Sequence, residues 1–181
     1  MIDILKINKK ILTLFDQIVV SGSNFLISIL ILRYLGIEEF GVFSFFWLII
    51  LFIGSIQQSL IISPLFSNVP KYKLSNLNLF YGNVFIQQII LIIFTILAFY
   101  LSSKLFDFVS SEYDLRKYFY ALSLLIVFFQ LYNFFRKLHY SKNLFLNIFI
   151  IDLIIYSIFF IIIIYCNFNN SLNLLIVLKI F

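Results

Sequence analysis

Residues 15–64 read FDQIVVSGSNFLISILILRYLGIEEFGVFSFFWLIILFIGSIQQSLIISP. Two long apolar runs flank a short polar stretch that holds Arg33, Glu38 and Glu39. A helix rises about 1.5 Å per residue and the hydrocarbon core of a bilayer is about 30 Å thick, so about 20 mostly apolar residues cross it once. Both runs are long enough, and we expect transmembrane helices at 12–35 and 40–63.

The composition of the whole chain agrees with this prediction. Hydrophobic residues make up 63% of the sequence, aromatic residues 20% and charged residues only 12%, which excludes an ordinary soluble globular domain. The net charge of +5 comes from basic residues in short segments between apolar runs. Such residues set membrane orientation, so we expect membrane lipid and no nucleic acid as a partner.

Three further apolar runs predict transmembrane helices at 79–101, 118–135 and 144–166. A sixth run begins at Ser171 and reaches Phe181 after about half the length of a span. The predicted fold is therefore an all-α, polytopic integral membrane protein with five complete transmembrane helices and a partial sixth at 171–181. Because this run stops at about half a span, we expect the chain to be part of a longer protein.

The orientation follows from the distribution of Lys and Arg between the two sides of the membrane. One side holds eight basic residues, namely Lys6, Lys9, Lys10, Lys71, Lys73, Arg136, Lys137 and Lys142. The other side holds Arg33, Lys104, Arg116 and Lys117, interspersed with acidic residues. Because short cytoplasmic loops are enriched in Lys and Arg, we expect a cytoplasmic N-terminus.

Polar side chains recur inside the predicted spans. At 3.6 residues per turn, an arc of about 60° on the first helix holds four of them: Gln17, Ser21, Asn24 and Ser28. We call these four residues the polar stripe. Other faces carry Gln58 with Ser44 and Ser55 on the second helix, Gln88 with Thr95 on the third, and Gln130 and Asn133 on the fourth.

Two interpretations of these polar faces are open. Small and amide side chains hold membrane helices together through close approach and interhelical hydrogen bonds. Alternatively, several polar faces converge on a hydrated cavity for a hydrophilic solute, which the repeated stripe favours. Asp16, Arg33 and Asp152 are further candidates because ionisable residues at membrane depth are rare, although each lies near a span end, where snorkelling to the interface is ordinary.

Motifs for chemistry are sparse in this sequence. His139 and Cys166 are the single histidine and cysteine, and neither has partners at a metal-ligand or catalytic-triad spacing. Glu112 and Asp114 are followed at once by Arg116 and Lys117, which indicates a solvated turn. The sequence therefore predicts neither an enzyme nor a metal or cofactor site.

The stretch from Phe15 to Pro64 resembles the N-terminal region of bacterial polysaccharide flippases of the Wzx kind, within the multidrug/oligosaccharidyl-lipid/polysaccharide exporter superfamily. A Ser-Gly-x-Asn-Phe-like patch lies on the first helix. The following turn matches the pattern Arg-x-Leu-Gly-x-x-x-Phe-Gly-x-Phe at Arg33, Leu35, Gly36, Phe40, Gly41 and Phe43. The Gln57-Gln58 pair and Ser63-Pro64 are also similar to that family.

The resemblance implies the N-terminal lobe of a twelve-helix transporter in the bacterial cytoplasmic membrane. Such proteins flip lipid pyrophosphate-linked sugar repeat units to the outer leaflet for surface polysaccharides such as O-antigen or capsule. Polar groups on the first helix would then bind sugars in a cavity, and cations such as Arg33 would neutralise the pyrophosphate. A second transporter half would be a partner, since two lobes enclose the substrate only together, and this chain alone would be inactive.

Rival functions remain open at this point. A multidrug or cation exporter of the same superfamily would share the fold and differ in its cavity. A membrane-embedded glycan polymerase or acyltransferase would need clustered Arg, His or carboxylates in an extracytoplasmic loop, and the longest such loop, 102–117, has no His. A membrane fragment without its own activity is the third alternative.

Overall fold

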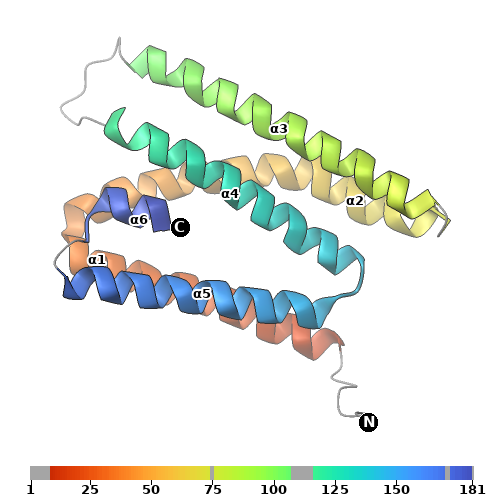
Figure 1. Ribbon diagram of the computed structural model, residues 1–181, viewed down its shortest axis with the longest axis horizontal. Coiled ribbons are helices and arrows are strands. Elements are labelled where there is room, and N and C mark those ends of the chain that lie inside the picture. The colour runs from red at the N-terminus through yellow and green to blue at the C-terminus, as the bar shows by residue number, and fades with distance from the viewer. Residues whose placement is uncertain (1–8, 74–75, 107–115, 170–171, 181) are drawn as a thin grey trace. The chain divides into compact units, whose positions relative to one another are not determined.

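The computed structural model describes residues 9–73, 76–106, 116–169 and 172–180 (Figure 1). Every regular element in these ranges is helical. Four helical stretches are long and apolar enough to cross a membrane: Ile11–Lys71, Leu77–Ser102, Tyr118–Ser141 and Phe145–Phe168. By helix length and composition, the chain is an all-α, multi-pass membrane protein.

The chain divides into two compact units. Unit 1 comprises Met1–Phe43 and Leu138–Phe181, and unit 2 comprises Ser44–Lys137. Each unit contains helical segments and buried residues, and each is described by itself.

Helix α1 runs from Lys9 to Gln57 and is interrupted at one residue, Gly36, with φ 83° and ψ 177°. Glycine tolerates this positive φ because it has no Cβ. The sequence predicted a gap at 36–39 between two spans, but Ile37 and the two residues after it are helical. In the structure, one glycine is enough to interrupt the helix.

The first apolar stretch is 61 residues long, which corresponds to about 90 Å of straight helix and about three thicknesses of a bilayer core. One perpendicular crossing cannot contain that length. The separate spans predicted at 12–35 and 40–63 lie on the two sides of Gly36, where two helical segments meet at a kink, and their membrane crossings remain a prediction.

Past α1, the helix changes its winding before it ends. A π-helix, η1 (Gln58–Ile62), leads into α2 (Ser63–Asn68) and a short 3₁₀ turn, η2 (Val69–Lys71). The Ser63 N–H donates to the carbonyl of Gln58, five residues earlier. Pro64 follows at once and has no N–H to donate to the preceding turn, which favours a local change of winding at this point.

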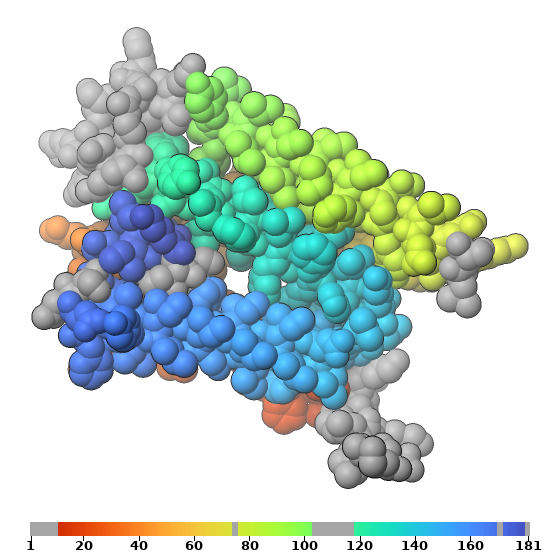
Figure 2. All heavy atoms as spheres, viewed as in Figure 1, coloured from red at the N-terminus to blue at the C-terminus, as the bar shows by residue number. Residues whose placement is uncertain are grey.

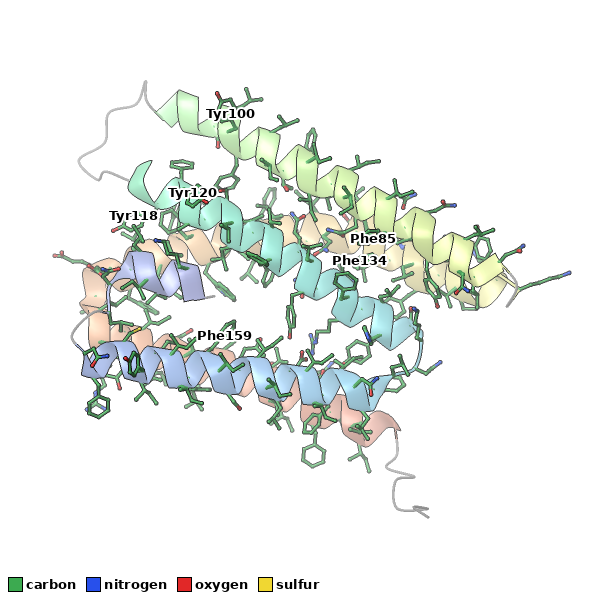
Figure 3. All side chains as sticks on the ribbon, in the orientation of Figure 1. Phe85, Tyr100, Tyr118, Tyr120, Phe134 and Phe159 are labelled. Carbon is green, nitrogen blue, oxygen red and sulfur yellow. The ribbon has the colours of Figure 1, made fainter. Side chains whose placement is uncertain are left out.

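Helices α3 (Leu77–Phe106) and α4 (Arg116–Ser141) pack antiparallel in unit 2. Phe85 early in α3 contacts Phe134 late in α4, with ring centroids 5.9 Å apart (Figure 3). Phe99 late in α3 contacts Phe119 early in α4 at the same centroid distance. Figure 2 shows the atoms of the two helices packed against each other. Phe134 is fully buried, so these aromatic contacts form part of the core of unit 2.

The C-terminal end of α4 belongs to unit 1 and closes with a Schellman motif. The Leu144 N–H donates to the carbonyl of His139 and the Asn143 N–H to that of Tyr140, while Asn143 adopts φ 59°. Asparagine is one of the few residues that readily adopt this left-handed conformation. The basic loop before α5 is therefore a tight turn with defined hydrogen bonds.

Helix α5 (Phe145–Phe168) corresponds to the predicted span 144–166, and α6 (Leu174–Ile180) lies within the predicted partial span 171–181. Asn173 caps α6, because its Oδ1 accepts a hydrogen bond from the Ile176 N–H at 2.9 Å. Ser171 and Phe181, the predicted limits of this span, lie outside the described residues, as does most of the predicted loop 102–117. Leu174, Val177 and Leu178 are buried in the structure.

Candidate functional site

A chain of buried amides joins three helical segments of unit 2. Gln57 Nε2 donates to Gln88 Oε1 at 2.9 Å and to the backbone carbonyl of Gln130 at 2.7 Å. Gln88 Nε2 donates to Gln130 Oε1 at 3.5 Å, and Gln130 Nε2 donates to Thr95 Oγ1 at 3.3 Å. Thr95 in turn donates to the carbonyl of Ile92 at 2.8 Å. The donors and acceptors thus follow one another from Gln57 through Gln88 and Gln130 to Thr95, with no donor facing a donor. We call Gln57, Gln88, Gln130 and Thr95 the amide network.

Burial makes the amide network important for the packing of unit 2. Gln88 and Gln130 are completely buried and Gln57 is 1% exposed. An amide buried without partners costs several kcal/mol in a hydrocarbon environment, whereas a neutral hydrogen-bonded amide avoids both that cost and the larger cost of a buried charge. The network therefore fixes the register of α1, α3 and α4 at one level of the unit.

A pocket of about 180 Å³ lies beside this network. Its lining comes from the last part of α1, from η1 and from α4: Leu51, Gly54, Gln57, Gln58, Ile62, Phe129, Asn133 and Lys137. All of these residues belong to unit 2. The polar lining combines three carboxamides with one ammonium group, while the rest of the lining is largely apolar.

Local backbone features shape this pocket. A Cβ on Gly54 would lie 3.3 Å from Phe129 Cε1, so glycine permits a close approach of α1 to α4. Trp47 packs edge-on against the Phe129 ring with centroids 6.0 Å apart. Because η1 begins at Gln58, the winding changes where the chain passes from the buried Gln57 to the exposed Gln58. Such π turns are frequent at functional sites.

The polar stripe occupies the border between two faces of α1 in unit 1. Ile27 and Ile31 define the buried face, and exposed Phe25 and Ile29 lie on the opposite side. Between these faces, Gln17 and Ser21 are exposed and Asn24 and Ser28 are half-buried, with the Ser28 hydroxyl donating to the backbone carbonyl of Asn24 at 2.8 Å. Packing within the chain thus leaves two of the four stripe residues exposed and two partly accessible.

The two candidate carboxylates are both buried in unit 1. Asp16 is 1% exposed and accepts a hydrogen bond from the Tyr140 hydroxyl, which ties the start of α1 to the end of α4. Asp152 is completely buried, one turn before Tyr156 on α5, whose ring packs edge-on against Phe159. Both carboxylates are packed inside unit 1, whereas a snorkelling side chain extends to the water at an interface.

The other two candidates differ from each other. Arg33 is exposed, three residues before the interruption at Gly36. Gln58 is exposed and lines the pocket in unit 2. All candidates except Gln58 thus belong to unit 1, where Asp16 is joined to Tyr140, a residue that the sequence did not single out.

Sequence reasoning also missed the amide network. The sequence shows Gln57, Gln88 and Gln130 as polar residues in apolar spans, and it favours Gln58 over its neighbour Gln57 as a site candidate. The available signal was the apolar face of the second span, because Gln57 lies seven residues after buried Ile50 and four before buried Ile61. A polar residue in register with an apolar face indicates a buried hydrogen-bonded side chain.

Among the residues described, no group of three or more His, Cys, Asp or Glu side chains has an arrangement that could hold a metal ion. Comparisons with family models, curated proteins and solved structures found no match. The resemblance to polysaccharide flippases therefore remains a prediction from the sequence.

Proposed function

We propose that this chain is the N-terminal lobe of a transporter that flips lipid pyrophosphate-linked sugar repeat units across the bacterial cytoplasmic membrane for surface polysaccharide synthesis. The observation that carries the proposal is the polar stripe in its sequence setting, directly before the flippase-like turn at 33–43. Hydroxyl and amide groups suit a solute rich in hydroxyls, because each can donate or accept a hydrogen bond.

The exposure of the stripe supports this proposal. A stripe that served only to join helices of its own unit would be covered by them, whereas Gln17 and Ser21 are exposed in the structure. Polar groups that face lipid are costly, so an accessible stripe suits a hydrated surface or a contact with another polar helix. A pathway between this lobe and a second transporter half would provide the hydrated surface.

Complementation in a bacterium that lacks its own polysaccharide flippase tests the proposal. The chain is expressed alone and together with a polypeptide that carries the remaining spans of a matching transporter, and surface glycan is measured. We expect export from the pair and none from the chain alone. Replacement of Asn24 by Leu should reduce export, whereas Leu26→Ala, on the exposed apolar face, should not.

The same strains distinguish a polysaccharide flippase from a multidrug exporter. If the pair restores no glycan but raises resistance to cationic drugs, the protein is a multidrug exporter and the sugar substrate is wrong. If the chain alone restores export at ordinary expression, the requirement for a second half is wrong.

A further inference from the structure

The π turn η1 places one extra residue between two regular helical segments of unit 2. The Ser63 N–H donates to the carbonyl of Gln58, which lies five residues earlier instead of the four of an α-helix. A π turn therefore holds one residue more than an α turn, and it usually stands as a single turn inside an α-helix. The last part of α1 and the following α2 consequently have helical registers that differ by one residue.

The two registers point to different glutamines. Two turns of an α-helix take about seven residues, so residues seven apart share a face. Buried Ile50 in α1 lies seven residues before Gln57, and buried Leu65 in α2 lies seven residues after Gln58. The register of α1 places Gln57 on the packed side, as observed, whereas the register of α2, continued backwards, would place Gln58 there.

Adjacent residues of this segment are chemically matched for a shift of one residue. Gln57 is followed by a second glutamine, and buried Ile61, one turn later, is followed by a second buried isoleucine, Ile62. A shift of one residue would bring Gln58 to the position of Gln57 and Ile62 to that of Ile61. The amide network and the apolar packing would then keep the same types of side chain.

A second place for the extra residue lies just before the glutamine pair, at Gly54 and Ser55. Irregular winding in helices concentrates at proline, at glycine–serine pairs and at π turns. Glycine adopts a wide range of backbone conformations, and the Ser55 hydroxyl donates to the carbonyl of Phe52, three residues earlier. The chain thus has a site for irregular winding on each side of the pair, with Pro64 after it and Gly54 and Ser55 before it.

We propose that the segment 57–62 has two helical registers, in which Gln57 and Gln58 alternate as the member of the amide network. In the structure the π turn follows the pair, and Gln57 donates to Gln88 and Gln130. In the second register the π turn precedes the pair, and the segment turns by about 100°, so that Gln58 makes those two hydrogen bonds. The buried amides are satisfied in both registers, as a two-state element requires.

The exchange of registers changes the lining of the pocket. Gln58 lines the pocket, and its side chain makes none of the hydrogen bonds found among the described residues, so no such bond has to break when it moves. In the second register Ser59 takes its place, and the lining loses an amide and gains a hydroxyl. A ligand that prefers one of these linings would favour one register. This inference does not depend on the proposed transport function.

A fluorine probe at Ser59 measures the two registers. Ser59→Cys, in a Cys166→Ser background, carries a trifluoroethylthio group, and the full chain is placed in nanodiscs for fluorine nuclear magnetic resonance. Because Ser59 is exposed and its surroundings differ between the registers, we expect two resonances. Gln57→Leu should raise the population ratio in favour of one resonance about fivefold, since interhelical amide hydrogen bonds contribute about that factor. Gln58→Leu should change the same ratio in the opposite direction.

Matched variants separate the exchange from local effects. Gln87→Leu replaces an exposed glutamine of α3 and should leave the populations unchanged. Unfolding in mixed micelles with increasing SDS gives a second measurement. Gln57→Leu should unfold at a higher SDS fraction than the double variant Gln57→Leu/Gln58→Leu, because only the single variant keeps a glutamine that can enter the network. Far-UV circular dichroism confirms that each variant is folded.

Three results would overturn the proposal. The same single resonance in the parent protein, Gln57→Leu and Gln58→Leu would show that the segment has one register. A change of the population ratio in the same direction in both variants would show a local effect of leucine near the probe. Equal SDS fractions for Gln57→Leu and the double variant would show that Gln58 does not replace Gln57 in the amide network.

Discussion

Three carboxamides form a connected set of buried polar contacts inside unit 2. A glutamine donates and accepts at once, so Gln57, Gln88 and Gln130 satisfy one another without a buried ion. An ammonium or carboxylate at the same depth would carry a much larger desolvation cost. In unit 1 the buried side chains include carboxylates, and Asp16 accepts from Tyr140.

The amide network predicts a stability difference between adjacent residues of α3. Gln88→Met removes the acceptor of Gln57 and the donor to Gln130, so we expect a loss of about 1–2 kcal/mol in the free energy of unfolding. Gln87→Met changes an exposed side chain and should cost little. Unfolding in mixed micelles with increasing SDS measures both, and equal stability of the two variants would contradict a structural role for the network.

The contact between Asp16 and Tyr140 predicts a second stability effect. Tyr140→Phe removes only the hydroxyl that donates to Asp16, and we expect the protein to lose about 1 kcal/mol of stability. Tyr165→Phe, at a residue that is 65% exposed on α5, is the matched control. The same SDS titration measures both variants, and a loss at Tyr165 as large as that at Tyr140 would argue against the contact.

At the scale of helices, two departures from regular α-helix lie close to candidate site residues. Gly36 interrupts α1 shortly after Arg33, and the π turn of η1 begins directly after the buried Gln57. Both lie in the part of the sequence that resembles flippases. The chain therefore combines long regular spans with two local irregularities, and the pocket adjoins the second of them.

The positive φ of Gly36 predicts a contrast between two glycines of α1. A Cβ at either Gly36 or Gly41 would meet no atom within 4 Å, so steric contacts do not distinguish them. Gly36→Ala forces alanine into a left-handed conformation and should destabilise the protein by about 1 kcal/mol or more. Gly41→Ala lies in regular helix and should be neutral or stabilising. SDS titration of the two variants measures the difference, and equal effects would contradict the interruption at Gly36.

Sequence reasoning predicted the helices well and the polar contacts poorly, for a physical reason. The apolar runs at 79–101, 118–135 and 144–166 correspond to α3, α4 and α5, because hydrocarbon thickness fixes the length of a span. The choice between Gln57 and Gln58 depends on which face of a helix is packed, and the π turn depends on local backbone geometry around Pro64. Hydrophobicity along the chain determines neither the packed face of the helix nor the position of the π turn.

At the scale of the whole molecule, the distribution of basic residues predicts how the helices are oriented in the membrane. The eight basic residues assigned to one side include Lys137 of the pocket and the loop after α4. Together with the four long apolar stretches, they predict a multi-pass protein with a cytoplasmic N-terminus.

Reporter fusions test this orientation. A reporter that is active only outside the cytoplasm should be active when it is fused after Asp107 and silent when it is fused after Asn143. The physical reason is the excess of Lys and Arg on the side that contains Asn143. The reverse pattern of activity would contradict the orientation and would place the pocket near the outer leaflet.

The central claim is that the polar stripe of α1 faces water in the assembled transporter. Single cysteines at Ser21, Asn24 and Ser28, in a Cys166→Ser background, are exposed to a membrane-impermeant thiol reagent in the presence of the second half. We predict labelling at all three, and no labelling at buried Ile27 and Ile31 or at Leu26, which is exposed but apolar in its surroundings. Lipid pyrophosphate-linked sugar should slow the labelling of the three stripe positions. Equal protection of all six positions would contradict the account, because the stripe would then be a contact between helices and not the wall of a pathway.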